Sequence, residues 1–559
     1  MALPVLVLLA MVTTTVFANT SPFPQSFHPT SHIYTISELD RTPTELLLLD
    51  SLSGFLARTA PSLYRISDSK SWRNNTQDSY SVWLLEMEKD GVTVNDTLAT
   101  SNVSSIIQQL TSSTQDSLSY LLCDASTNSV SAALTLAAAS DTLLLVAGDN
   151  TTAAALHSIG ATLTQDLRGS SIDKILSSKV LANLSTTVFV FQNPSKSKFL
   201  GDWTIFARAP NMVWNASCPA QKMVLDRVVD YGAAFGWGPE NNYVTTLNSH
   251  GIWVHASDYN KNFPALSNSA TLTKMKTTAA ATTVDTTVDT TVDTPAATTG
   301  TAATRLAKSE PNQNKHVVSF LMTDGDNLQW TLGPWSTSNQ WYGSSHRGAF
   351  PMGWTLSPAI VDLAPSAAKK MLETQTNNDE FVAGPSGYGY MYPTTLPASN
   401  RSNFALLTHL KMSALGMNTI NVLGQNDAIP NCDELSDFMK NLEHGMIFYS
   451  WGDGYSGLHG KTFSCDGKLI ISGRWSLWGN STDVKNDMVG VKAMTEKILQ
   501  MKGHTKASLS DSYTFIPVHA WSHSYDDVRQ IVESLPTADF EVVLPSEMLR
   551  RMATLVKEV

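Results

Sequence analysis

The sequence predicts an α/β protein, with a C-terminal (β/α) barrel-like domain preceded by an N-terminal α/β region that has a mostly parallel sheet. In the N-terminal half, short and continuously apolar runs alternate with helical segments, a pattern typical of strands buried in parallel sheets. A Thr/Ala-rich tract then interrupts the chain. The stretch after this tract has the length of one (β/α) barrel, roughly 250 residues.

Two strand–helix units can be recognised in the N-terminal half. The first has a strand over Ser117–Cys123 and a helix over Ser129–Ala139, and the second has a strand over Asp141–Ala147 and a helix over Thr151–Ile159. No glycine-rich phosphate loop follows either strand, so the sequence indicates no nucleotide site. We expect no cofactor.

Changes in residue composition along the chain indicate the domain boundaries. The tract from Thr271 to Thr304 contains three T-T-V-D repeats and cannot bury a core, which is typical of a disordered linker or inserted loop. The first 18 residues are apolar and end in small side chains, which predicts a secretory signal; an anchor helix is the alternative. The expected parts are a signal peptide over 1–18, an N-terminal α/β region of one or more subdomains over 19–262, a Thr/Ala-rich linker or insert over 263–315 and the barrel-like domain over 316–559.

Surface chemistry predicts a secreted, extracellular glycoprotein. The 38 basic and 49 acidic residues give a net charge of −11, which argues against nucleic acid because phosphate binding needs a basic surface. Beyond the leader, no segment has the length and apolar character that crossing a bilayer requires, so we expect no membrane insertion. Besides Asn19, sequons of the N-x-Ser/Thr type lie at Asn74, Asn95, Asn102, Asn150, Asn183, Asn215, Asn400 and Asn480.

Four cysteines fit an oxidising compartment, which permits two disulfides. Their positions favour Cys123–Cys218 and Cys432–Cys465, one in each half, although four cysteines allow three connectivities. None lies in a C-x-x-C pair, so the sequence indicates neither a zinc knuckle nor a redox motif.

The C-terminal part contains eight strand-like runs: Val317–Met322, Met352–Leu356, Phe381–Gly384, Asn418–Leu423, Met446–Trp451, Lys468–Ser472, Tyr513–His519 and Glu541–Leu544. Helical segments separate most of them: Ala359–Gln375, Asn403–Leu415, Cys432–Leu442, Val484–Gln500, Tyr525–Leu535 and Ser546–Val556. The connections after the first and fifth strands show no clear helix. We therefore expect an irregular barrel, with an open doubly wound sheet as the alternative.

Carboxylates follow several of these strands, at the end where barrel enzymes build their sites. Asp324 and Asp326 are two residues apart, so in an extended chain both point to one side, and close like charges separate their pKa values. Asp453 and Glu547 follow later strands and complete the candidate catalytic set. The alternatives are a plain turn or a calcium loop for the aspartates, and stabilisation of a helix start for Glu547.

Aromatic and polar side chains follow the same strands, and sugar sites combine carboxylates with Trp and Tyr platforms. Candidate substrate-binding residues at these strand ends are Asn327, Tyr388, Tyr390, Tyr392, Trp451, Trp475, His519, Trp521 and His523. His519 and His523 are four apart, so metal ligation is an alternative for them. We predict no metal site.

The stretch Gly387–Pro393 reads GYGYMYP and matches the signature G-x-G-Y-x-Y-P, so the chain resembles the GxGYxYP family, whose members are inferred to be glycoside hydrolases. Further stretches similar to the family's pattern are Phe235–Tyr243, Val254–Tyr259, Val318–Trp330 and Phe381–Pro385. The resemblance implies a multi-part N-terminal region, a C-terminal barrel-like domain and a carbohydrate substrate. By position, Asp324, Asp326, Asn327, Tyr388, Tyr390 and Tyr392 match the family's motifs. Glu240 and Asp258 lie in two of the similar stretches and become candidate substrate contacts or loop caps.

The leading hypothesis is a secreted glycoside hydrolase that cleaves glycosidic bonds with paired carboxylates. Two alternatives stay open. One is a metal-dependent carbohydrate hydrolase such as a deacetylase, to whose motifs the H-A-W-S-H and T-D-G-D runs are loosely similar. The other is a non-catalytic secreted glycan-binding protein, in which the aromatics bind and the aspartates are structural.

Overall fold

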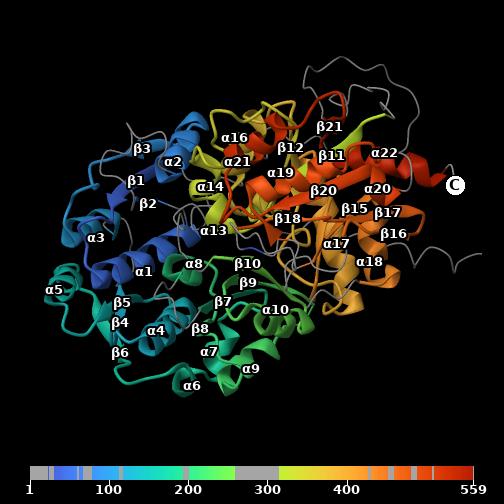
Figure 1. The fold of residues 1–559 in the computed structure, drawn as a ribbon. Coiled ribbons are helices and arrows are strands. Elements are labelled where there is room, and N and C mark those ends of the chain that lie inside the picture. The colour runs from blue at the N-terminus through green and yellow to red at the C-terminus, as the bar shows by residue number, and fades with distance from the viewer. Residues whose placement is uncertain are drawn as a thin grey trace, which may run out of the picture.

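The computed structural model describes residues 23, 31–59, 62–66, 79–111, 118–192, 200–228, 230–257, 314–425, 430–450, 459–479, 488–505 and 509–557. Its N-terminal elements gather at the left of Figure 1 and its C-terminal elements at the upper right. The strands β7 to β10 lie below and between these two groups. The expected leader over 1–18 and nearly all of the expected linker over 263–315 fall outside the described residues.

Three small sheets make up the N-terminal half, and every strand pair in them is parallel. Their orders are β2-β1-β3, β5-β4-β6 and β10-β9-β7-β8. The strands are β1 (His32–Ser37), β2 (Leu63–Ile66), β3 (Thr93–Asn95), β4 (Ser119–Cys123), β5 (Leu143–Val146), β6 (Thr162–Asp166), β7 (Val188–Gln192), β8 (Asn211–Val213), β9 (Gly232–Gly236) and β10 (Ile252–Ala256). The helices between them are α1 (Pro43–Thr59), α2 (Ser79–Lys89), α3 (Val103–Thr111), α4 (Thr127–Ser140), α5 (Asn150–Ser158), α6 (Ile172–Ile175), α7 (Ser178–Ala182), α8 (Gly201–Phe206), α9 (Pro219–Leu225) and α10 (Glu240–Ser249).

Two sheets make up the C-terminal part, with orders β13-β12-β11-β20-β18-β19 and β14-β15-β17-β16; β21 also pairs with β11. The strands are β11 (His316–Met322), β12 (Met352–Leu356), β13 (Asp379–Ala383), β14 (Asn421–Gly424), β15 (Gly445–Ser450), β16 (Thr462–Cys465), β17 (Lys468–Ser472), β18 (Ser476–Leu477), β19 (Met488–Val489), β20 (Tyr513–Val518) and β21 (Phe540–Val542). The helices are α13 (Leu328–Thr331), α14 (Pro334–Thr337), α15 (Ile360–Leu363), α16 (Pro365–Glu373), α17 (Ala398–Ala414), α18 (Cys432–Met439), α19 (Val491–Gln500), α20 (Leu509–Ser512), α21 (Tyr525–Glu533) and α22 (Pro545–Lys557).

The two C-terminal sheets are joined at two places. A parallel bridge between Ala383 and Ile420 joins the edge strands β13 and β14. Just beyond β17, the backbone N–H of Arg474 donates to the carbonyl of Phe515 in β20 (2.9 Å). The strand pairings confirm the mostly parallel α/β class, while a closed barrel stays a prediction.

Local sequence explains where the elements begin and end. The strands β11, β12, β7, β9 and β10 are buried along their whole length, as expected for strands covered on both faces. The single helix expected over Ala359–Gln375 is two helices, because Pro365 lacks the N–H that would continue α15 and instead begins α16. Helix α21 begins in a capping box formed by Ser524 and Asp527.

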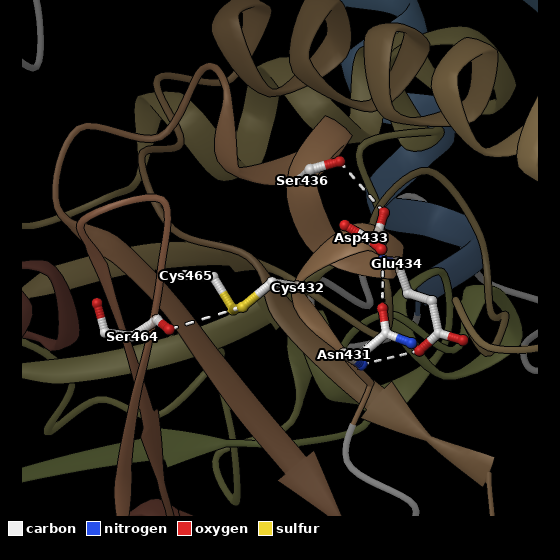
Figure 2. The surroundings of a disulfide bond; sticks show 7 residues. All are labelled: Asn431, Cys432, Asp433, Glu434, Ser436, Ser464 and Cys465. Carbon is white, nitrogen blue, oxygen red and sulfur yellow. Dashed lines mark hydrogen bonds between the residues drawn. A yellow bond between two sulfur atoms is a disulfide. The ribbon is translucent and has the colours of Figure 1, made fainter.

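A disulfide between Cys432 and Cys465 ties the start of α18 to the β16–β17 hairpin (Figure 2). The Cα atoms are 5.3 Å apart and the bond closes a loop with a sequence separation of 33. Beside it, Asn431 and Glu434 form the capping box that begins α18. This disulfide agrees with the pairing expected for the C-terminal half.

The second expected disulfide, Cys123–Cys218, is wrong, because both cysteines are free thiols. Cys123 is buried at the end of β4, and burial raises the pKa of its thiol to about 12. Cys218 caps α9, where its thiol contacts Asp173 Oδ1 (3.4 Å). The expected pairing was based only on the positions of the cysteines in the sequence, which do not show which side chains lie next to each other in the fold.

Removing the C-terminal disulfide with the double variant Cys432→Ser/Cys465→Ser is expected to destabilise the protein by about 2–4 kcal/mol, because the unfolded chain regains the entropy of an open loop. Urea unfolding of the oxidised wild type and the double variant measures this difference. Addition of a reductant should lower the wild-type midpoint to that of the variant. A wild-type midpoint that does not respond to reductant would contradict the prediction.

Candidate active site

A tight turn follows β11 and carries both candidate aspartates. The N–H of Asn327 donates to the carbonyl of Asp324 (3.1 Å), and α13 begins directly afterwards. Asp324 has a φ of 68°, a left-handed conformation that costs free energy for a residue other than glycine and is often kept at functional sites. Gly325 is required here, because a Cβ atom would lie 1.9 Å from the carbonyl oxygen of Thr355 and 2.5 Å from the Trp335 ring.

The carboxylate of Asp324 accepts side-chain hydrogen bonds from the hydroxyl of Thr323 and from the indole N–H of Trp521 (2.8 Å). Burial raises the pKa of Asp324 above its usual range, while these two donors and the backbone of Ala520 favour the ionised form and oppose the rise. The side chain is partly exposed rather than sealed in the core. Asp324 is thus a carboxylate held in one orientation within reach of solvent.

Asp326 lies in a different electrostatic environment. Burial, together with the negative charge of Asp324, raises the pKa of Asp326 to about 8, and a hydrogen bond with Thr355 only partly offsets the rise. At neutral pH this carboxyl group is therefore mostly protonated. Its side chain is partly exposed, like that of Asp324.

Two tryptophans stack beside Asp324. The rings of Trp330, from α13, and Trp521, from the loop after β20, are 4.2 Å apart between centroids with an interplanar angle of 22°. Trp521 is 43% exposed, which is unusual for so large an apolar side chain, and its N–H is the donor to Asp324. A flat aromatic face therefore stands next to a carboxylate.

The two histidines of the H-A-W-S-H run have different roles. His519 stacks on Trp478 at a centroid distance of 3.6 Å, and its Nδ1 is 2.8 Å from the Ser522 hydroxyl. Burial, and then the neighbouring His523, lowers the pKa of His519 to about 4. His523 is buried, with Nε2 2.9 Å from the Gly479 carbonyl and Nδ1 3.4 Å from Asp527. Both nitrogens of His523 are thus engaged, and the described residues contain no group of three or more His, Cys, Asp or Glu side chains placed to hold a metal.

The signature tyrosines point mainly into the protein. Tyr388 is fully buried and donates to Asp362 Oδ2 (2.6 Å), while Oδ1 of the same carboxylate accepts from Lys411 (2.8 Å). Tyr392 is buried, and burial raises the pKa of its hydroxyl. Neither ring can stack on a substrate in this conformation, so we leave both out of the proposed substrate contacts.

Tyr390 is partly exposed and joins the C-terminal part to the third sheet. Its backbone forms an antiparallel bridge with Val254 of β10. Its hydroxyl donates to Glu240 at the start of α10, and its ring packs edge-on against Trp237 (5.1 Å). Glu240 and Tyr390, expected as substrate contacts, are therefore direct neighbours from two parts of the chain.

The aspartate turn and the signature loop lie at the same end of neighbouring strands. Thr355, near the end of β12, accepts from the N–H of Gly325 (3.0 Å). On its other side, a Cβ atom at Gly384, the first residue of the signature loop, would lie 3.0 Å from the Thr355 methyl group. The side chain of Thr355 thus lies between the aspartate turn and the signature loop. Its role was not predicted from the sequence.

The sixth expected strand, Lys468–Ser472, agrees with β17, but the residues after it form a further short strand, β18. Pairing with β20 begins at Arg474 and reaches Leu477, so Trp478 and not Trp475 follows the last paired residue. Trp475 lies beside Lys497 of α19, whose Nζ is 5.1 Å from the ring centroid. We correct Trp475 to Trp478 in the candidate site.

Glu547 is at the wrong end of the strands to act with Asp324. It lies in the first turn of α22, where its carboxylate accepts from Arg550 (2.7 Å) and Arg551 (2.6 Å). Burial alone would raise the pKa of Glu547, but these hydrogen bonds outweigh it and lower the pKa below the usual value. The adjacent Ser546 donates its backbone N–H to Glu380. Glu380 lies at the start of β13, whereas Gly384 follows the other end of that strand. Glu547 is therefore withdrawn from the catalytic set.

Three candidates, Trp451, Asp453 and Asp258, lie outside the described residues. Asn327 is described; it caps α13, and its buried Oδ1 has no hydrogen-bond partner in the structure. Trp330, Trp478, Trp237 and Thr355 were not predicted as site residues. Trp237 and Trp478 come directly after β9 and β18, so exact strand ends would have indicated them, whereas Trp330 lies farther from β11, in α13.

Comparison with known proteins identifies the family. Three profiles of one family match in chain order: the "GxGYxYP_N 1st domain" over residues 32–112, the "GxGYxYP third domain" over 185–268 and the "GxGYxYP putative glycoside hydrolase C-terminal domain" over 314–553. Together they cover more than half of the sequence. The chain belongs to the GxGYxYP family. The resemblance read from Gly387–Pro393 is thereby confirmed, and the family is described as one of glycoside hydrolases.

A solved structure has the same fold as this GxGYxYP chain. The chain is similar to a crystal structure of "a putative hydrolase from Bacteroides thetaiotaomicron VPI-5482", with a TM-score of 0.74, 20% identity and 96% of each chain covered. A 4-alpha-glucanotransferase from Thermococcus litoralis matches with a TM-score of 0.29 and 11% identity over 42% of this chain and 40% of that one, and this carries no argument. No curated protein matches the sequence.

Proposed function

We propose that this protein is a secreted glycoside hydrolase that uses Asp324 and Asp326 as its two carboxyl groups. The single observation that carries the proposal is that one turn holds Asp324, which accepts a hydrogen bond from the exposed Trp521, and Asp326, whose pKa burial and the neighbouring Asp324 raise to about 8. Membership of the family supports a carbohydrate as the substrate.

The different surroundings of the two aspartates give them different roles in the proposed reaction. Asp326, with a pKa of about 8, holds a proton at neutral pH and donates it to the leaving-group oxygen as general acid. Asp324, which accepts from Thr323 and Trp521, is the ionised partner that acts as base or nucleophile. The same division of two carboxyls by burial and hydrogen bonding operates in other glycosidases.

Secretion is part of this proposal. The disulfide between Cys432 and Cys465 is favoured by an oxidising compartment. Among the described sequons, Asn102, Asn150, Asn183 and Asn215 are exposed and open to glycosylation. The described residues contain no helix that could cross a membrane. Glycosidase treatment of the protein expressed in a secretory host tests this part through the loss of mass from N-glycans.

The hydrolase is tested by incubating the full-length protein with a panel of 4-methylumbelliferyl glycosides and soluble polysaccharides. We expect release of fluorophore or reducing sugar from at least one, with loss of activity in Asp326→Asn and retention in Asp226→Asn. Asp226 is a suitable control because it is an exposed carboxylate that pairs with Lys222 on α9. Binding of a glycan without any cleavage would contradict the proposal and favour a glycan-binding protein. Activity that a chelator abolishes would favour the metal-dependent alternative.

Trp521→Phe separates the two roles of this tryptophan, because it removes the N–H that donates to Asp324 but keeps a ring against Trp330. Without that donor the ionised form of Asp324 is less stable, so its pKa rises. We expect the acid limb of the kcat/KM profile to move up by about 0.5–1 pH unit. An unchanged acid limb would show that Asp324 is not the group that titrates there.

A further inference from the structure

We propose that the candidate site takes an extended carbohydrate chain, which runs from Asp324 across the domain junction to Trp237 of the third sheet. This inference rests on the proposed function for the chemical class of the ligand. It goes beyond that function in two respects: the ligand is a chain of several sugars, and residues from the third sheet help to bind it.

Five incompletely buried aromatics form the proposed lining, and each closely follows a strand: Trp330, Trp521, Trp478, Tyr390 and Trp237. Four belong to the C-terminal part, after β11, β20, β18 and β13. The fifth, Trp237, comes directly after β9 in the third sheet. We call these five residues the aromatic lining.

Contacts join the lining residues in two groups. Trp237 packs against Tyr390 at 5.1 Å, and these two side chains pack against the same large buried cluster as Trp478. Trp478 stacks on His519, whose Nδ1 is 2.8 Å from the hydroxyl of Ser522. The neighbouring Trp521 stacks on Trp330 and donates to Asp324.

The length of the lining excludes a single small sugar as its full occupant. Neighbouring strands lie about 4.8 Å apart, and the lining residues follow β13, β11, β20 and β18, which belong to one sheet, and β9, which belongs to another. One pyranose ring covers one aromatic face. Several faces in a row therefore suit a chain of sugars, whose apolar faces stack on the rings while their hydroxyl groups meet carboxylates such as Glu240.

The alternative is that Trp237 and Tyr390 only seal the domain junction. In that case their loss would lower stability and leave glycan binding unchanged. Binding and unfolding must therefore be measured on the same variants.

The experiment uses the full-length Asp326→Asn protein, in which the proposed cleavage is blocked. Native gels containing laminarin, xylan, galactomannan or glycogen first identify a polysaccharide that retards the protein. Calorimetry then measures affinity for oligomers of that polysaccharide. We expect affinity to rise with length, and Trp237→Ala to weaken binding of long oligomers by roughly tenfold, the effect of losing about 50 Å² of apolar contact, while short oligomers bind as before.

Phe463→Ala is the matched control, because it truncates a partly buried aromatic on the β16 hairpin, away from the lining. Trp237→Leu keeps apolar bulk against Tyr390 and serves if Trp237→Ala does not fold. Retardation by none of the polysaccharides, affinity that does not depend on length, or equal affinities with and without Trp237 would overturn the inference.

The outcomes separate this inference from the proposed function. Length-dependent binding through Trp237, combined with no cleavage by the wild type, would keep the extended site and reject the hydrolase. Cleavage of an aryl glycoside by the wild type, combined with affinity independent of length, would keep the hydrolase and reject the extended site.

Discussion

Replacing Asp324 with Asn is expected to lower kcat/KM for glycoside hydrolysis by at least about a thousandfold. The amide oxygen can still accept from Trp521 and the amide NH2 can donate to the Thr323 hydroxyl, so the shape of the turn is retained, but the amide cannot act as base or nucleophile. Initial rates on the glycoside that the wild type cleaves best measure the effect.

The control for this prediction is Asp226→Asn, the same chemical change on the exposed face of α9. It should leave both kcat/KM and the free energy of unfolding within experimental error. If Asp324→Asn retained more than about a tenth of the wild-type kcat/KM, Asp324 would have no direct part in the chemistry. Far-ultraviolet circular dichroism and the unfolding midpoint establish that any loss is not one of folding.

The second large effect concerns stability. Asp326→Asn should abolish turnover yet stabilise the protein by about 1–3 kcal/mol at pH 8, because the neutral amide does not incur the cost of an ionised carboxylate in this turn. The folded-state pKa of Asp326 is about 8, well above the value of about 3.9 in an unfolded chain. Between these values the folded state binds more protons than the unfolded state, so wild-type stability falls as pH rises.

The difference between wild type and Asp326→Asn should therefore be small near pH 4, grow through neutral pH and level off above pH 8. Urea unfolding at about six pH values gives the curve. A difference that is constant with pH would show that Asp326 titrates alike in both states. Destabilisation that deepens toward pH 8 would show that the folded protein favours the charged form.

Much of the fold follows from hydrophobic patterning. The bounds expected for the strands at Met352–Leu356 and Lys468–Ser472 agree with β12 and β17, because turn residues flank both runs closely. The carboxylate turn at Asp324 was also predictable, since it directly follows a continuous apolar strand. Burial is the larger cause of the raised pKa of Asp326, and the contribution of the Asp324 charge to that rise agrees in direction with the expectation from close like charges.

The predictions that were wrong depend on contacts between segments far apart in the chain, which the order of residue types does not show. Gly473 looks like the end of a strand, yet pairing resumes beyond it and carries the chain on to Trp478. Glu547 follows a strand, but β21 is short and pairs only with the first residues of β11, so its end does not reach the level of Asp324. The signature tyrosines were expected to face a substrate, whereas their environment depends on where the third sheet docks, as the Val254–Tyr390 bridge shows.

The central claim is that one turn holds an ionised and a protonated aspartate that act together on a glycosidic bond. The pH dependence of kcat/KM for the wild type tests it most directly. We predict a bell-shaped profile whose alkaline limb falls with a pKa near 8, the value for Asp326. Activity that stays level up to pH 10 would contradict the account, because Asp326 would then be ionised without loss of catalysis.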